Sequence, residues 1–316
     1  MNCVQVPGGQ ACRPALQPER IGAGNTGKIF RNGNKICAKA FCGFFDGFFY
    51  SFRIGPSRSC KERLSASATF YFLSSFTHDL TGIQPVVSTK ASEQAKPGQF
   101  ISVYTKDGSR LLPRPISICE IDREEGRLRI VYRIAGAGTE EFSHYEPGDS
   151  IEIMGPLGNG FPTEGKKVFL IGGGIGIPPM LELAKTLDCE KQMILGYRDE
   201  NLFLKEEFEA WGQVYVATED GSAGTKGNVL DAIREHGLTA DVMYACGPTP
   251  MLRALKEYAR EHQIRCYISL EEKMACGIGA CLACVCKSKD VDHHTNVNNK
   301  RICKDGPVFL AEEVEL

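Results

Sequence analysis

Three cysteines close together in the sequence have a spacing that suits an iron–sulfur cluster. Cys276, Cys281 and Cys284 follow the pattern C-x4-C-x2-C, and two further cysteines come later, Cys286 and Cys303. This is the ligand spacing of a plant-type [2Fe–2S] site, in which a fourth thiolate arrives from farther along the chain. Two irons bridged by two sulfides need four thiolates within reach of one short loop. We therefore predict a [2Fe–2S] site in this segment.

The fourth ligand is the next question, and Cys303 is the better candidate. Cys286 lies only two residues past Cys284, so on an extended segment it would tend to point away from the other sulfurs. Gly277 and Gly279 would let backbone N–H groups turn toward the sulfurs, because no Cβ stands in the way. A zinc site or a set of free thiols is the alternative. Zinc sites usually present two CxxC-like pairs, and only one x2 pair exists here.

Two glycine-containing turns form a second candidate site. The first turn reads LIGGGIGIPPM, from Leu170 to Met180, and the second reads ACGPTPM, from Ala245 to Met251. Each leads from a strand into a helix, where free backbone amides can bind a pyrophosphate. Two such turns on the carboxyl edge of one sheet form a ligand crevice. The predicted dinucleotide-binding residues are Gly172, Gly173, Gly174, Gly176, Cys246, Gly247 and Pro248. An ordinary strand–helix turn is the alternative, since neither turn has the pattern G-x-G-x-x-G.

Charged residues after two other strands bear on the choice of nucleotide. Glu219 and Asp220 could accept hydrogen bonds from ribose hydroxyls, or they form only a solvated acidic turn. Arg198 is followed by two acids, Asp199 and Glu200, which disfavours a pocket dedicated to a 2′-phosphate. The sequence therefore favours NAD over NADP.

A third candidate site lies nearer the N-terminus. Arg114 could clamp a phosphate, and the Ser117 hydroxyl could bond a flavin ring, both within the segment RPIS. An ordinary strand with an edge proline is the alternative. Gly138 and Thr139 read as a helix start whose amides could bind a phosphate.

The elements that must position these residues change in kind along the chain. Short alternating strands with frequent turns, at 99–104, 127–134 and 150–154, predict an antiparallel Greek-key barrel. Strands and helices then alternate, which predicts a parallel α/β sheet. Its strands are expected at 168–171, 192–197, 214–218 and 242–246, and its helices at 179–187, 203–211, 229–236 and 250–262.

The first eighty residues do not show this pattern of predicted strands and helices. Residues 1–80 hold ten Lys and Arg against four Asp and Glu, and twelve of the 27 Phe and Tyr. They show neither sustained strand alternation nor a helical stripe. We expect a disordered leader, or one that is not native to the fold. A membrane-associating or regulatory extension is the alternative. The predicted domains are thus a leader at 1–80, a barrel at 81–162, an α/β domain at 163–268 and a cluster domain at 269–316.

Composition limits the class of protein. The 316 residues carry a net charge of −2 and are 42% hydrophobic, which argues against a nucleic-acid binder that relies on bulk positive charge. No apolar run approaches the ~20 residues of a membrane-spanning helix, so we expect no membrane partner. The start MNCVQVPGGQACRP lacks the pattern of a secretory signal. Fourteen cysteines without such a signal are not expected to form a disulfide framework. We expect a cytoplasmic protein.

Together these motifs resemble the ferredoxin-reductase superfamily. The nearest likeness is to the electron-transfer subunits of NAD-linked, B-type dihydroorotate dehydrogenases. It covers about residues 96–316 and is carried in order by PGQFISVY, RPISI, VYRIAGAGT, GGGIGIPPM, SLEEKMACGIGACLACVCK and ICKDGPVF. The resemblance implies that FAD is held by Arg114, Pro115, Ile116, Ser117, Val131, Tyr132, Arg133, Gly138 and Thr139. It also implies that the cluster is ligated by Cys276, Cys281, Cys284 and Cys303.

The resemblance also implies a function. An FMN-containing catalytic subunit would oxidise dihydroorotate, and this chain would pass the electrons through [2Fe–2S] and FAD to NAD⁺ in pyrimidine (UMP) biosynthesis. Two copies of each subunit would form a heterotetramer, and no general base is needed in this chain. The alternatives are the flavin subunit of an NADH-dependent ferredoxin:NADP⁺ oxidoreductase, a sulfide dehydrogenase or a hydrogenase, and a non-catalytic cluster scaffold.

The chain departs from the family pattern at its start. Family members begin their barrel with two strands just before the PGQF turn, but in this chain only 83–88 of residues 60–95 is strand-like. We therefore expect a barrel with an unpaired edge.

Overall fold

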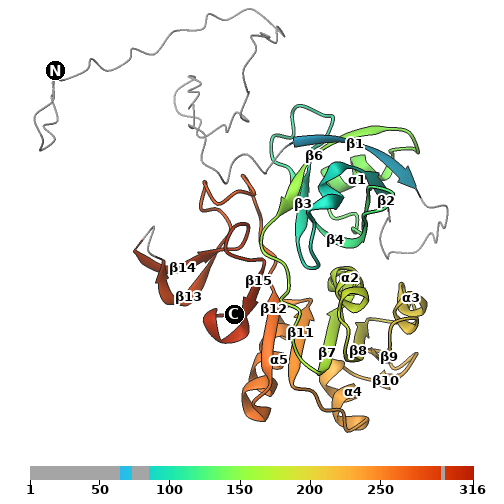
Figure 1. Cartoon of the computed structure of the whole chain (residues 1–316), viewed down its shortest axis with the longest axis vertical. Coiled ribbons are helices and arrows are strands. Elements are labelled where there is room, and N and C mark those ends of the chain that lie inside the picture. The colour runs from blue at the N-terminus through green and yellow to red at the C-terminus, as the bar shows by residue number, and fades with distance from the viewer. Residues whose placement is uncertain (1–64, 73–84, 293–295) are drawn as a thin grey trace, which may run out of the picture. The chain divides into compact units, whose positions relative to one another are not determined.

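Six antiparallel strands close into a barrel (Figure 1). The computed structural model describes residues 65–72, 85–292 and 296–316. The barrel elements are β1 (Ser65–Phe72), β2 (Pro85–Ser88), β3 (Phe100–Val103), β4 (Arg114–Asp122), β5 (Arg127–Ile130), α1 (Ala137–Ser143) and β6 (Ser150–Leu157). Neighbouring strands follow the order β1-β2-β5-β4-β3-β6. The predicted antiparallel barrel is confirmed.

Strand β1 corrects the predicted start of the barrel at residue 81. It pairs with β2, where Thr69 lies opposite Ser88, and with β6, where Ser65 lies opposite Met154. The expected unpaired edge is therefore wrong. The sequence SASATFYF does alternate with a period of two, which is a strand signal, but the aromatic-rich surroundings hide it. The rest of the predicted leader, 1–64 and 73–80, lies outside the described residues.

Side chains alternate between two environments along the barrel strands. On β3, Ile101 and Val103 belong to the barrel core, whereas Phe100 belongs to a core shared with the C-terminal half of the chain. Ile116 and Ile118 of β4 likewise face the barrel core. Successive residues of a strand point to opposite faces, so the outer face of β3 and β4 is available to other parts of the molecule.

A parallel sheet follows the barrel, as predicted. Its elements are β7 (Lys167–Gly173), α2 (Pro178–Thr186), β8 (Glu190–Tyr197), α3 (Lys205–Glu209), β9 (Gln213–Thr218), β10 (Thr225–Lys226), α4 (Val229–Glu235), β11 (Val242–Cys246), α5 (Thr249–His262) and β12 (Arg265–Ser269). The sheet order is β10-β9-β8-β7-β11-β12-β15. Residues of α2 and α3 share one core with alternate strand residues, and residues of α4 and α5 share another core. Helices therefore cover both faces of the sheet.

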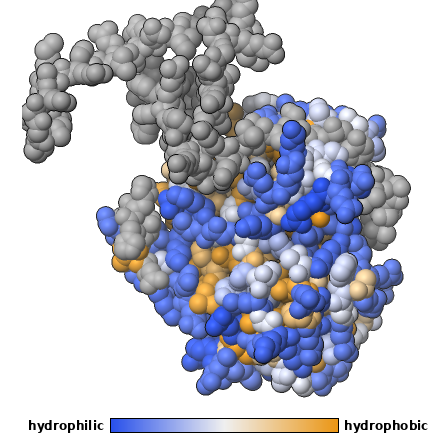
Figure 2. Space-filling model, in the orientation of Figure 1, coloured by the Kyte–Doolittle hydropathy of each residue, from blue (hydrophilic) through white to orange (hydrophobic). Residues whose placement is uncertain are grey.

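The C-terminal segment contributes to two sheets. Strands β13 (Val285–Asp292) and β14 (Val297–Arg301) form a hairpin, and β15 (Val308–Leu310) pairs antiparallel with β12. The sequence did not indicate this last strand, which ties the cysteine-rich domain to the nucleotide sheet. Figure 2 shows a largely hydrophilic face with apolar surface gathered toward its middle. No helix in the described ranges is long and apolar enough to span a membrane.

Candidate functional site

The cysteine loop brings four sulfurs together. Backbone N–H groups of Ile278, Ala280 and Cys281 donate to the Cys276 sulfur over 3.5, 3.3 and 3.4 Å. The Gly279 N–H donates to the Cys303 sulfur over 3.1 Å. Backbone donors turned toward sulfur are what a thiolate-bound cluster needs, because they stabilise its negative charge.

Hydrogen bonding lowers the pKa of two thiols of this loop, Cys276 and Cys284. Hydrogen bonds from the Cys303 thiol, the Ile278 and Cys281 N–H groups and the Cys281 thiol lower the pKa of Cys276 to about 4, against the effect of burial. Hydrogen bonds from the Cys303 thiol and backbone lower the pKa of Cys284 to about 6, again against burial. The pKa of Cys303 is raised, since its thiol serves as the donor to both neighbours. Side-chain contacts therefore link the predicted ligands in sequence, Cys281 to Cys276 and both Cys276 and Cys284 to Cys303.

Glycines and one buried ion pair shape the loop. Gly277 and Gly279 have φ angles of +66° and +80°, in the left-handed region that glycine adopts without strain. Arg301, at the end of β14, is buried and pairs with Asp305 over 3.0 Å. The same Asp305 carboxylate accepts from the Arg301 N–H over 2.8 Å. This closed turn carries Cys303 to the other sulfurs.

Cys286, which we expected to point away from the other sulfurs, is the next cysteine in the sequence after Cys284. Cys286 lies on β13 opposite Lys300, and burial raises the pKa of its thiol. The nine cysteines of the described residues are all free thiols. In the same residues, no three or more His, Cys, Asp or Glu side chains form a ready-made cage for a metal ion. The four predicted ligands are nevertheless linked by direct contacts between their thiols.

The two glycine turns meet at the carboxyl ends of adjacent strands β7 and β11. A Cβ on Gly176 would lie 2.3 Å from the carbonyl oxygen of Cys246, and one on Gly247 would lie 3.2 Å from Gly173. Only glycine lets the backbones of the two turns come this close. A Cβ on Gly172 would lie 2.8 Å from the Cα of Ile177. The two turns therefore pack against each other at the edge of the sheet where we predicted a dinucleotide crevice.

Cys246 is the last residue of β11, at the second glycine turn. It does not have the properties of a nucleophile. Its side chain is fully buried, and burial raises the pKa of its thiol, with a smaller contribution from the charge of Glu271. The thiol therefore stays protonated at neutral pH. Glu271, an exposed residue that the sequence did not single out, lies at the start of the cysteine domain. Glu219 and Asp220 are exposed and directly follow β9. In the sheet, β8 lies between β9 and the strand β7 that leads into the first glycine turn.

The predicted flavin segments also come together. The Arg114 guanidinium lies against the start of α1, where a Cβ on Gly138 would be 2.0 Å from its Nε. The Thr139 hydroxyl accepts from the Ala135 and Gly136 N–H groups over 2.9 and 3.2 Å. That hydroxyl therefore holds its own turn, and a phosphate would be bound by Arg114 and backbone amides.

The remaining flavin candidates divide into buried and exposed positions. Val131 and Tyr132 are buried, and the Tyr132 ring packs edge-on against Phe142 of α1. Their side chains thus support the site from within, and only their backbones would face a flavin. Leu112 and Ile134 are 55% and 51% exposed, which is unusual for large apolar side chains. They flank the two flavin segments in the sequence. The Arg114 guanidinium held against the start of α1 gives these segments a cation for a phosphate, so the residues present fit the group.

A polar junction joins the barrel to the nucleotide domain. The Glu182 carboxylate on α2 is buried and accepts from the Ile121 N–H on β4 over 2.9 Å. Lys185 of α2 pairs with Glu120, and Arg129 of β5 pairs with Glu207 of α3 over 2.6 Å. Helix α2 follows the first glycine turn, and β4 begins with Arg114. The junction therefore couples the nucleotide crevice to the flavin strand.

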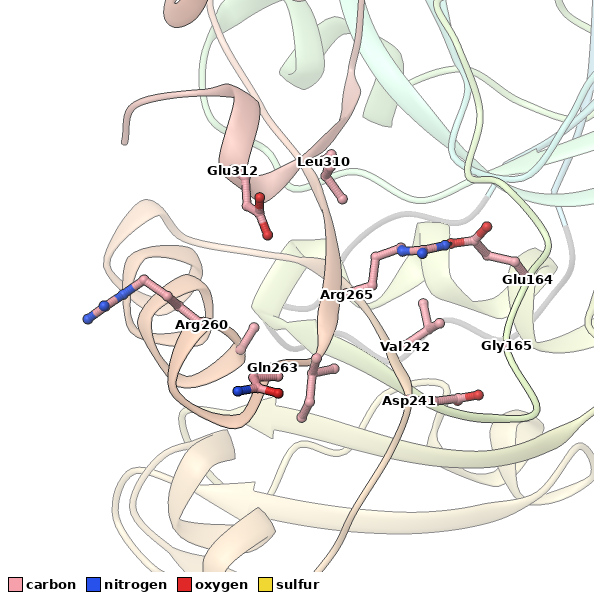
Figure 3. A pocket seen from close by; sticks show the side chains of 11 residues that line it. Glu164, Gly165, Asp241, Val242, Arg260, Gln263, Arg265, Leu310 and Glu312 are labelled. Carbon is pink, nitrogen blue, oxygen red and sulfur yellow. The ribbon is translucent and has the colours of Figure 1, made fainter.

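A groove of about 730 Å³ lies elsewhere on the nucleotide domain (Figure 3). Asp241 and Arg265 line it from the amino ends of β11 and β12, at the opposite end of the strands from the glycine turns. Its side chains are already paired: Arg265 and the Tyr267 hydroxyl donate to Glu164 over 2.9 and 2.8 Å. This groove is not the nucleotide crevice.

Comparison with known families agrees with this arrangement. Residues 271–315 match the iron–sulfur cluster binding domain of dihydroorotate dehydrogenase B, and residues 170–257 match the oxidoreductase NAD-binding domain. The chain is 43% identical over 265 residues to the electron transfer subunit of dihydroorotate dehydrogenase B (NAD⁺) from Bacillus caldolyticus. That match covers 81% of this chain and 99% of the relative. The Caldanaerobacter subterraneus subunit of the same name is 48% identical over 69% of this chain and 86% of its own length.

Solved structures show the same fold. A chain of an NADH-dependent reduced ferredoxin-NADP oxidoreductase, studied for flavin-based electron bifurcation, superposes with a TM-score of 0.69 and 30% identity. The match covers 79% of this chain and 89% of that one. A ferredoxin NADP⁺ reductase from Neisseria gonorrhoeae, with bound FAD and NADP, superposes with a TM-score of 0.52 and 17% identity, covering 62% and 91%. At that identity the likeness concerns the fold alone.

Proposed function

Because the chain belongs to the family of electron transfer subunits of NAD⁺-linked dihydroorotate dehydrogenase B, we propose that it carries electrons from dihydroorotate to NAD⁺. A separate FMN-containing subunit removes two electrons and two protons from dihydroorotate to give orotate. In this chain a [2Fe–2S] cluster and FAD, when bound, would supply the one-electron and two-electron chemistry that links the two substrates. With NAD⁺ as the acceptor, the overall products would be orotate, NADH and one proton.

The observation that carries this proposal is the convergence of four sulfurs and their backbone donors in residues 276–303. A flavin, when bound, exchanges either one or two electrons and so links a one-electron cluster to a two-electron nicotinamide. Cys276, Cys281, Cys284 and Cys303 would hold the cluster.

The chain's residues otherwise bind and orient. Arg114 and the amides after Gly136 would bind the flavin phosphates. The crevice between Gly176 and Cys246 would hold the dinucleotide. The protonated Cys246 thiol would serve as packing beside the nicotinamide and would take no part as a nucleophile. No acid or base for dihydroorotate is assigned to this chain, since that chemistry belongs to the partner subunit.

The alternative reading, a subunit of an NADH-dependent ferredoxin:NADP⁺ oxidoreductase, has one specific observation in its favour. The solved structure that superposes with a TM-score of 0.69 carries that name. Its 30% identity is well below the 43% and 48% of the dihydroorotate dehydrogenase subunits. Similarity therefore favours dihydroorotate as the source of electrons.

We further propose a cytoplasmic location and a complex with two copies of each subunit. Free thiols throughout the described residues, four of them gathered as cluster ligands, suit a reducing compartment.

Co-expression with a candidate FMN-containing subunit tests the function. We expect a stable complex that reduces NAD⁺ with dihydroorotate under anaerobic conditions. A complex that forms but accepts electrons only from ferredoxin or sulfide would contradict the proposal and support the alternative. Protein that binds FAD and cluster yet reduces no dye with NADH would indicate a non-catalytic scaffold.

A further inference from the structure

One buried hydroxyl of the barrel has no hydrogen-bond partner. Ser102, on β3, is 1% exposed, and its Oγ has no donor or acceptor within reach. An unpaired hydroxyl inside a protein costs free energy, of the order of 1–3 kcal/mol. A buried hydroxyl without a hydrogen-bond partner suggests that a bound group supplies that partner.

Ser102 belongs to the outer face of the barrel. Its neighbours Ile101 and Val103 point into the barrel core, so Ser102 points out, as does Phe100. Across the strand pair, Ser102 lies opposite Pro115 and Phe100 lies opposite Ser117. The outer face of β3 therefore continues onto the segment proposed to hold FAD, one strand spacing, about 4.8 Å, away.

The same face is covered by the cysteine loop. The Cα of Gly277 sits so close to the barrel that an added Cβ would lie 3.0 Å from the Ser102 Oγ. The same Cβ would lie 3.2 Å from Leu157 and 3.3 Å from Met154, two residues of β6. Gly277 directly follows the proposed ligand Cys276. The Ser102 hydroxyl thus lies beside the loop that carries Cys276, on a strand that pairs with β4, the strand proposed to hold FAD.

We propose that the Ser102 hydroxyl, from which no cysteine sulfur accepts a hydrogen bond, donates one to an inorganic sulfide of the [2Fe–2S] site and so raises the cluster's reduction potential. The inference rests on the proposed function, since it requires a bound cluster. Reduction adds negative charge to the sulfurs, and a donor stabilises the reduced form more than the oxidised form. The Ser102 hydroxyl would contact the cluster directly, and it takes no part in bond making.

The test is an EPR-monitored redox titration of the holoprotein and of Ser102→Ala. We expect the variant to fold and load its cluster, because the hydroxyl it loses has no partner within the protein itself. Its cluster should be harder to reduce by about threefold to tenfold in the equilibrium constant, up to about 59 mV for a one-electron couple. Ser102→Thr keeps the hydroxyl and should restore the potential.

Thr225→Val is the matched control. Thr225 is also buried with an unpaired hydroxyl, but it lies on β10 at the far edge of the nucleotide sheet. Its variant should leave the cluster potential unchanged. An unchanged cluster potential in Ser102→Ala, or a shift of the flavin potential in its place, would overturn the inference while the proposed function stands. Wild-type protein that takes up no cluster would instead refute the proposed function.

Discussion

The cysteine loop and the flavin face of the barrel are built in opposite ways. The loop's ligands lie within residues 276–303, and backbone donors from the same segment point at their sulfurs. The flavin face takes Arg114 and Gly138 from β4 and α1, and its outer surface depends on the register of β3 with β4. One site is local in sequence, and the other exists only after the barrel has closed.

This difference determines how strongly a single substitution should affect each site. A local site is fixed by residue type and spacing, so a single ligand decides whether it forms. An assembled site shares its binding over many backbone groups, so a single change should weaken it by a finite amount.

The largest effect is expected from Cys303→Ser. The variant should lose the cluster, and NAD⁺ reduction by dihydroorotate should fall by more than about 100-fold, because even outer-shell changes at metal sites cost 10–100-fold. Visible absorbance and EPR after anaerobic reconstitution measure the cluster. Cys286→Ser is the matched control and should keep it. If Cys286→Ser loses the cluster and Cys303→Ser retains it, the ligand assignment is wrong.

Arg114→Ala should weaken the flavin site without abolishing it. Loss of a charge-assisted hydrogen bond to phosphate is worth about 1.5–3 kcal/mol, which is about 10–100-fold in FAD affinity. Fluorescence titration of the apoprotein with FAD measures the change. The control Arg260→Ala removes an arginine that pairs only at the surface of α5. Equal FAD affinity in wild type and Arg114→Ala would contradict the proposed phosphate contact.

Glu182→Leu tests the junction that joins the flavin strand to the nucleotide domain. It leaves the Ile121 N–H without its acceptor, which should lower the free energy of unfolding by about 1–3 kcal/mol and slow flavin reduction by NADH. Glu182→Gln keeps an acceptor oxygen and should restore both properties. Urea unfolding and stopped-flow absorbance measure them. A Gln variant as impaired as the Leu variant would show that the carboxylate charge matters more than the hydrogen bond.

The smallest effect is expected in the groove at the amino ends of β11 and β12. Glu164→Gln weakens a partly exposed pair with Arg265, so stability should fall by at most about 1 kcal/mol. Because the groove lies away from the glycine turns, the KM for NADH should not change. A raised KM for NADH would place the nucleotide in this groove and contradict the crevice.

The sequence predicted the local features well. Strand β11 was expected at 242–246, and the structure has Val242–Cys246. The cysteine spacing singled out Cys276, Cys281 and Cys284, because spacing within a loop is a local property. Cys303, the candidate chosen over Cys286, makes contact with two of them in the structure.

Features that depend on pairing could not be predicted in the same way. Strand β15 has only three residues, and its place beside β12 follows from tertiary packing. Ser102 looked like an ordinary strand residue, since only the register and the cover by Gly277 give it an environment. Strand β1 carried a period-two signal but lay among aromatic residues without one. Long-range contacts decided all three.

Residues 276–303 are proposed to hold a cluster that exchanges electrons with a flavin on the barrel, and rapid-freeze EPR of the reconstituted protein after mixing with NADH measures this exchange. We predict bleaching of the flavin absorbance and the appearance of the rhombic signal of a reduced [2Fe–2S] cluster. A flavin that bleaches beside a cluster that dithionite reduces but NADH never does would contradict it.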